Sequence, residues 1–171
     1  HVDHGKTTLV DCLLRQSGVF RANEQVQERV MDSGDLERER GITILSKNTA
    51  VNYKGCRINV LDTPGAFDFS GEVMEALRAA DAAVFVVPAG DEIDPTTVAL
   101  WRECAQVAMP RIIAITKLDQ GRASFDDMVE ACVDAFGDGV IPALIPLTVD
   151  GANVGNLSLL NKRAHDYSSG A

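Results

Sequence analysis

The first residues of this 171-residue chain carry side chains that suit phosphate chemistry. The segment His1 to Thr8 runs directly into apolar residues at helical spacing, which predicts a loop that opens into a helix. Gly5 lets the backbone turn its amides toward phosphate oxygens, and the helix N-terminus adds a positive dipole end. Lys6 would then bridge β- and γ-phosphates, and the Thr7 hydroxyl would ligate Mg²⁺. Taken alone, this segment also fits an ordinary turn before a helix.

A second candidate metal ligand is Thr43, in the segment Arg40-Gly41-Ile42-Thr43-Ile44. Its hydroxyl would complete the Mg²⁺ shell, and a loop held in this way is ordered only when phosphate and metal are both present. The preceding stretch, 24–40, is rich in charge. The segment alone therefore also fits a solvated loop that leads into a strand.

An acidic residue follows the next apolar run. Asp62-Thr63-Pro64-Gly65 comes after residues 58–61, so Asp62 lies at the carboxyl end of a predicted strand, where α/β proteins bind ligands. Asp62 would hold Mg²⁺ through water, and Gly65 would offer its amide to a γ-phosphate. The same four residues also suit a plain β-turn.

A possible base reader, Thr116-Lys117-Leu118-Asp119, ends a later apolar run. The Asp119 carboxylate can accept from the N1 hydrogen and the 2-amino group of guanine, whereas adenine has no donor at either place. Lys117 would lay its stem across the base plane. The three motifs and Thr43, in this order and at element ends, predict a site for GTP or GDP with Mg²⁺.

Composition argues against other classes of site and partner. His1 and His4 lack a third ligand nearby, and the four cysteines are too scattered for zinc or redox pairs. Free thiols suit a reducing cytosol, so we expect a cytoplasmic protein. The net charge of -9 excludes a broad basic surface, so we expect no DNA partner and at most a local RNA contact. No apolar stretch approaches the roughly eighteen residues of a membrane span, so we expect no membrane partner.

The elements that position these residues follow from periodicity. Short apolar runs predict strands at 49–53, 57–61, 82–87 and 111–116, and the last two suit strands buried on both faces. Amphipathic segments predict helices at 6–17, 70–80, 95–108 and 124–136. The alternation predicts one α/β domain over 1–171, with a mostly parallel sheet flanked by helices. A strand normally precedes a phosphate loop, so we expect the first strand to be missing.

Through these motifs, the chain resembles the GTP-binding domain of translation-factor GTPases. His1 to Thr8 and Arg40 to Ile44 are specific to that class. Up to about residue 51, including Gln27 to Ser33, the chain resembles the TypA (BipA) family, and from Val60 onward it resembles elongation factor G and its paralogues. The resemblance implies a P-loop NTPase (GTPase) fold and a monomeric factor that hydrolyses GTP on the ribosome, through a local contact with large-subunit RNA.

The resemblance also assigns roles to residues. It gives Asp3 a place near the γ-phosphate, and Val2 with Ile42 an apolar gate beside the attacking water. The implied nucleotide-binding set is Val2, Asp3, His4, Gly5, Lys6, Thr7, Thr8, Asp62, Gly65, Thr116, Lys117 and Asp119. The implied Mg²⁺ ligands are Thr7, Thr43 and Asp62.

The chain departs from the family pattern at Ala66, where the family has the histidine that positions the attacking water. Losing such a group typically costs about 10² to 10⁴ in rate, so we expect binding to persist while turnover falls. Thr116 stands where asparagine is commoner, which predicts weaker guanine affinity. A loop that caps the base is also absent, and residues 145–171 resemble the start of the subdomain inserted in elongation factor G. We therefore expect a domain that is incomplete at both ends.

Three alternatives stay open at this point. The chain fits a GTP-dependent ribosome-binding switch with little hydrolysis, and it equally fits a ribosomal protection protein, which shares these motifs. The third alternative is a truncated fragment that binds no nucleotide.

Overall fold

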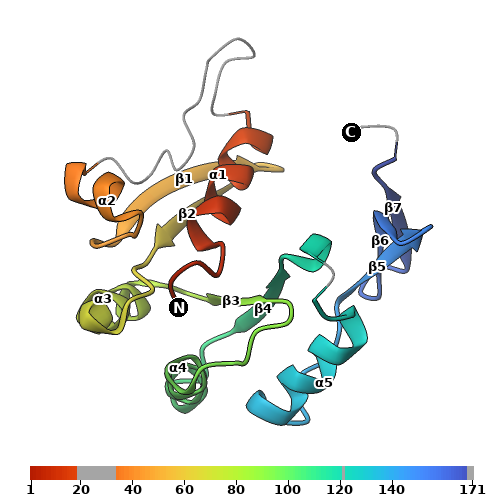
Figure 1. The fold of residues 1–171 in the computed structure, drawn as a ribbon. Coiled ribbons are helices and arrows are strands. Elements are labelled where there is room, and N and C mark those ends of the chain that lie inside the picture. The colour runs from red at the N-terminus through yellow and green to blue at the C-terminus, as the bar shows by residue number, and fades with distance from the viewer. Residues whose placement is uncertain (19–33, 121, 169–171) are drawn as a thin grey trace. The chain divides into compact units, whose positions relative to one another are not determined.

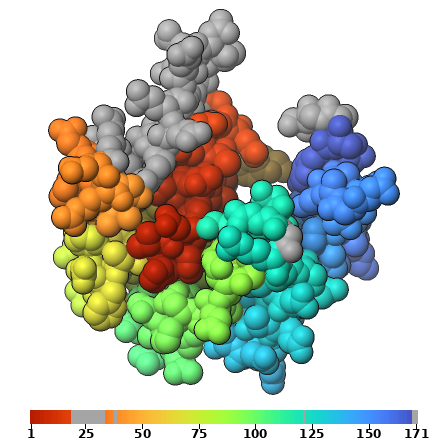
Figure 2. Space-filling model, viewed as in Figure 1, coloured from red at the N-terminus to blue at the C-terminus, as the bar shows by residue number. Residues whose placement is uncertain are grey.

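A computed structural model describes residues 1–18, 34–120 and 122–168 of the chain (Figure 1). The resemblance at Gln27 to Ser33 therefore lies outside the described residues. Clustering of the backbone divides the chain into two compact units. The first comprises His1–Val86 and Glu103–Ala114, and the second comprises Val87–Arg102 and Ile115–Ala171. In the space-filling view, described residues of both units are visible, from red near the N-terminus to blue near the C-terminus (Figure 2).

The first unit contains an antiparallel hairpin of β1 (Lys47–Tyr53) and β2 (Cys56–Asp62). Its two-residue turn has positive φ at Lys54 (48°) and Gly55 (80°), as the twist of a type I′ hairpin requires. The register runs from Tyr53 opposite Cys56 to Lys47 opposite Asp62. The start of β1 and the end of β2 therefore lie side by side, at the end of the hairpin away from its turn.

Helix α1 (Lys6–Gln16) packs on this hairpin. Val10, Leu14 and Val51 form its buried core, at 7%, 2% and 6% exposure. The helix begins after Gly5, whose φ of 91° a residue with a side chain rarely adopts. Gly5, the N-cap residue, supplies no side-chain cap at this end, where the first amides of a helix have no partner within the helix itself.

The first unit also holds two helices outside the hairpin. These are α2 (Asp35–Arg40) and α3 (Ser70–Ala79), and a short 3₁₀ turn, Phe67–Phe69, leads into α3. The sequence predicted α3 within one residue but not α2.

Strand β3 (Ala83–Pro88) pairs with β4 (Arg111–Thr116). The Ala83 amide donates to the Pro110 carbonyl at 2.9 Å and the Ala89 amide to the Thr116 carbonyl at 2.8 Å. These bonds advance along both strands in one direction, so the strands are parallel. Among the described strands, the expected parallel arrangement applies to this pair, and the other pairings are antiparallel.

The expectation that β3 and β4 are buried on both faces is wrong for the first half of β3 and for the whole of β4, in which no residue is fully buried. Val84 is 56% exposed and Ile112 63% exposed, whereas Phe85 to Pro88 are buried. Apolar runs predict strands well, but they do not say whether another element covers each face.

The remaining helices begin at the residues that the sequence marked. Helix α4 (Pro95–Gln106) follows Asp94, whose carboxylate accepts from the Thr97 amide at 3.0 Å. Helix α5 (Phe125–Phe136) follows Ser124, which accepts from the Asp127 amide at 3.1 Å. In the second unit the Trp101 and Phe136 rings lie 4.6 Å apart, so this tryptophan packs α4 against α5.

The second unit ends in an antiparallel sheet with the order β5-β6-β7. Its strands are β5 (Leu144–Val149), β6 (Ala152–Ser158) and β7 (Arg163–Asp166). They occupy the part of the chain that resembles the start of an inserted subdomain, and periodicity had not predicted them. Within 1–18, 34–120 and 122–168, no helix is both long and apolar enough to cross a membrane.

Candidate functional site

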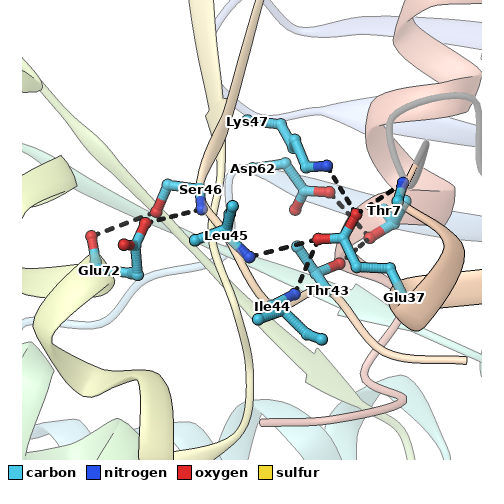
Figure 3. Close-up of polar contacts among 10 residues, drawn as sticks. Thr7, Glu37, Thr43, Ile44, Leu45, Ser46, Lys47, Asp62 and Glu72 are labelled. Carbon is cyan, nitrogen blue, oxygen red and sulfur yellow. Dashed lines mark hydrogen bonds and ion pairs between the residues drawn. The ribbon is translucent and has the colours of Figure 1, made fainter. Parts of the chain in front are cut away.

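Three oxygen-bearing side chains from separate elements meet in the first unit (Figure 3). The Thr7 hydroxyl, in the first turn of α1, donates to Asp62 Oδ2 at 2.8 Å and lies 3.2 Å from Thr43 Oγ1. Thr43 is 6% exposed and Asp62 3% exposed. Hydroxyl and carboxylate oxygens are the ligand types that Mg²⁺ prefers, so this donor set fits the ion.

The fold explains why these residues meet although 36 and 55 positions separate Thr7 from its two partners. The hairpin register sets Lys47 opposite Asp62, so the segment that leads into β1, including Thr43, passes the end of β2. Packing of α1 on the hairpin then brings Thr7 to the same end.

Two further candidates lie close together at the phosphate loop. Lys6 Nζ donates to the His1 carbonyl at 2.5 Å. A Cβ built on Gly65 would overlap the His1 carbonyl oxygen and would lie 2.5 Å from Lys6 Nζ. The chain after Asp62 therefore approaches the phosphate loop so closely that only glycine fits.

The remaining loop residues differ in burial. The His4 ring is buried, with Nδ1 3.1 Å from the Val86 carbonyl oxygen, so the side chain anchors the loop on β3. Asp3 is exposed and has a positive φ of 59°. Thr8 is also exposed, and half-buried positions are taken by Val2, Ile42 and Ala66. Among the described residues, no group of three or more His, Cys, Asp or Glu could hold a metal.

Sequence reasoning missed a buried carboxylate beside this site. Glu37 of α2 is 4% exposed and accepts from the amides of Ile44 at 3.0 Å and Leu45 at 3.3 Å. It also accepts from the Gly34 amide at 3.2 Å and from Lys47 Nζ at 2.6 Å. Burial alone raises the pKa of Glu37, but the hydrogen bonds from Lys47 and the amides outweigh it and lower the pKa to about 2.

A second carboxylate accepts a hydrogen bond from the residue after Leu45. Glu72, in the first turn of α3, accepts from the Ser46 amide at 2.8 Å, and its carbonyl accepts from the Ser46 hydroxyl at 3.3 Å. The amides of three successive residues, 44–46, thus donate to two carboxylates. The charge-rich stretch had suggested a solvated loop, yet Thr43 and Glu37 within or beside it are buried. An acid three residues after the N-cap Gly34, as in a capping box, is the signal that could have pointed to Glu37.

The candidate base-reading motif, residues 116–119, lies in the second unit. Thr116 ends β4, with its hydroxyl 3.5 Å from the Val87 carbonyl oxygen. Lys117 is half-buried at a positive φ of 59°, and a 3₁₀ turn, Leu118–Gln120, follows. The Gln120 amide closes this turn on the Lys117 carbonyl at 3.1 Å. Asp119 is left exposed on the turn.

Comparison with known proteins gives consistent matches. The family described as the elongation factor Tu GTP binding domain matches residues 1–166. The large ribosomal subunit assembly factor BipA of Bacillus subtilis is 52% identical over 136 residues, which cover 80% of this chain and 22% of that protein. The protein of the same name from Synechocystis sp. is 49% identical over 136 residues, covering 80% and 23%. These matches extend beyond the first 51 residues in which the sequence had suggested that similarity.

A solved structure also matches. A crystal structure of a protein from Thermus thermophilus has a TM-score of 0.89 at 30% identity, covering 100% of this chain and 26% of that one. The chain thus spans about a quarter of the length of each of these three proteins.

Proposed function

This chain belongs to the elongation factor Tu GTP-binding domain family, and on that premise we propose that it binds GTP and GDP with Mg²⁺ and hydrolyses GTP slowly on the ribosome. The α/β fold is that of a P-loop GTPase. The observation that carries the proposal is a cluster of three side-chain oxygens. Asp62 Oδ2 lies 2.8 Å from the Thr7 hydroxyl oxygen, and Thr43 Oγ1 lies 3.2 Å from it.

In this proposal the first unit holds the phosphates and the metal. Thr7, Thr43 and Asp62 would hold Mg²⁺, which when bound would neutralise negative charge on the phosphate oxygens. Lys6 and the loop amides from Val2 to Thr8 would bind the β- and γ-phosphates. Gly65, whose backbone approaches Lys6 closely, would donate its amide to the γ-phosphate.

Selection of guanine would come from the second unit. The exposed Asp119 carboxylate is available to accept from guanine N1 and the 2-amino group. Adenine would leave that carboxylate unpaired, which in a dry site disfavours ATP by roughly 10⁴-fold. Lys117 would cover the base plane, and Thr116 would supply a hydroxyl where the family commonly has an amide.

Slow hydrolysis follows from Ala66. Its methyl group can neither accept nor donate a proton, so nothing at this position orients a water for attack on the γ-phosphate. Val2 and Ile42, both half-buried, would still exclude other water from that side. GTP would therefore persist on the protein, which favours a second reading of the same site as a long-lived GTP-dependent switch.

The ribosomal partner is proposed from the relatives. Both are named large ribosomal subunit assembly factor BipA, and we infer that this chain acts in the cytoplasm through a local contact with large-subunit RNA. Its net charge of -9 argues against a wide RNA-binding surface.

Nucleotide binding is tested by titrating the protein with a fluorescent GDP or GTP analogue, with and without Mg²⁺. We expect saturable binding that Mg²⁺ strengthens, and the Asp62→Asn variant should lose most of that Mg²⁺ effect. Asp68→Asn, an exposed position six residues later, is the matched control. An absence of saturable binding to the wild-type protein refutes the proposal.

The ribosomal part needs a separate experiment. Sedimentation with purified large subunits should retain more protein with a non-hydrolysable GTP analogue than with GDP. Equal retention with both nucleotides, or none, would refute a GTP-dependent ribosomal role while leaving nucleotide binding intact.

A further inference from the structure

The segment that follows Thr43 is held by carboxylates on two different helices (Figure 3). Glu37 on α2 accepts from the amides of Ile44 and Leu45, and Glu72 on α3 accepts from the amide of Ser46. Lys47, the first residue of β1, returns to Glu37 at 2.6 Å. Four consecutive residues are thus fixed by side chains from outside their own segment.

Because Glu37 is buried, breaking its hydrogen bonds with the segment after Thr43 is energetically costly. The Glu37 side chain is 5% exposed, and its charge is balanced by Lys47, which is 20% exposed. If Ile44 and Leu45 moved away, this carboxylate would lose two amide donors while still buried, and an unmatched buried charge is strongly unfavourable. Thr43 precedes Ile44 directly, so its backbone cannot leave without breaking these bonds.

We propose that Glu37 is a positioning residue that holds Thr43 beside Thr7 and Asp62 before any nucleotide binds, with Glu72 joining this arrangement to α3. The proposal rests on the proposed GTP and Mg²⁺ site, and it replaces the expectation from sequence that the Thr43 loop is ordered only when phosphate and metal are both present. A loop that is already ordered spares the nucleotide the cost of ordering it. The arrangement therefore favours the GTP-bound state, in which Thr43 would contact the metal, over the GDP-bound state.

Simple stabilisation of the fold predicts a different pattern. If Glu37 only stabilises the first unit, its loss weakens GTP and GDP binding alike. If it positions Thr43, its loss weakens binding of GTP with Mg²⁺ far more than binding of GDP. The ratio of the two affinities is therefore the measurement that separates the two roles.

The test compares Glu37→Gln with Glu39→Gln in the full chain. Glu39 lies on the same short helix but is exposed, which makes it the matched control. Dissociation constants are measured for a non-hydrolysable GTP analogue and for GDP across a Mg²⁺ series. For Glu37→Gln we expect the affinity for the analogue at saturating Mg²⁺ to fall about tenfold and the affinity for GDP to fall less than twofold. A tenfold loss means that the loop is pre-ordered in about a tenth of the variant molecules. Glu39→Gln should leave both constants unchanged.

A second measurement needs no nucleotide. In the nucleotide-free protein, hydrogen exchange at the Ile44 and Leu45 amides should be slow in the wild type and at least tenfold faster in Glu37→Gln. Should that variant fail to fold, Glu72→Gln replaces it, because it releases the Ser46 amide alone and should shift the GTP-to-GDP ratio in the same direction.

The outcomes separate the two proposals. Equal losses for both nucleotides, or exchange that is already fast in the wild type, would overturn the positioning role while leaving the nucleotide site in place. A wild-type protein that binds neither nucleotide would instead overturn the proposed function, and the positioning role with it.

Discussion

Acid should destabilise this protein through Glu37, and the size of the effect can be worked from its contacts. The hydrogen bonds from Lys47 and the backbone amides outweigh the effect of burial and lower the pKa of Glu37 from 4.5 to about 2. At about 1.4 kcal/mol per pKa unit, that difference corresponds to about 3 kcal/mol of folding free energy. Little is lost to solvent screening, because the side chain is 5% exposed.

The sign follows from the direction of the shift. Because the folded protein holds Glu37 as a carboxylate at lower pH than the unfolded chain does, the stabilisation is fully present above pH 4.5. It is lost as the pH falls toward 2, where the folded protein must also take up the proton. Glu37→Gln removes the charge at every pH, so this variant should lack that part of the pH dependence.

Urea unfolding followed by circular dichroism, at half-unit steps from pH 6 to pH 2, measures the effect. We expect Glu37→Gln to be about 3 kcal/mol less stable than the wild type at pH 6 and nearly equal to it at pH 2. Glu39→Gln, at an exposed position, should follow the wild type throughout. Parallel pH curves for the wild type and Glu37→Gln would refute the reasoning, because they would mean that Glu37 has the same pKa folded and unfolded.

Three other changes test the site and the core. Ala66→His should raise single-turnover GTP hydrolysis by about 10² or more, because it restores a water-positioning group; no increase in phosphate release would show that Ala66 does not limit the rate. Gly65→Ala should weaken binding of a GTP analogue at least tenfold, because the new methyl group would overlap the phosphate loop, whereas Gly71→Ala, where a Cβ meets nothing within 4 Å, should not. Leu14→Ala should lower the unfolding free energy by about 2 to 5 kcal/mol, since Leu14 is 2% exposed in the α1 core. Leu13→Ala, at 42% exposure, should cost much less, and equal losses in urea melts would contradict the packing.

Local sequence signals gave most of the helices and the first four strands. The helices that begin after Gly5, at Pro95 and after Ser124 are marked by residues whose conformation or hydrogen bonding favours a helix start. Helix α2 was not predicted, because Asp-Leu-Glu-Arg-Glu-Arg has no apolar stripe. Its contacts instead come from Glu37 to residues up to ten positions later, which periodicity cannot reveal.

The candidate site divides in the same way. The order of the motifs along the chain predicted Thr7, Thr43 and Asp62 as Mg²⁺ ligands, because each carries a suitable oxygen within its own short motif. Their meeting depends on the hairpin register and on the packing of α1, which spacing along the chain does not specify. Glu37 and Glu72 were missed because charged residues in a polar stretch are usually solvated, and only the three-dimensional structure shows the amides that they bind.

The type I′ turn of the β1–β2 hairpin offers a place for a reporter. Cys56 is exposed directly after that turn, and six residue steps separate it from Asp62, about 20 Å along the strand at about 3.3 Å per residue. Of the other cysteines, Cys104 and Cys132 are buried and Cys12 is exposed. With Cys12 changed to serine, a fluorophore on Cys56 would lie at the turn end of the hairpin, far enough from the phosphate loop to report on the orientation of the first unit in the proposed ribosomal complex without touching the nucleotide.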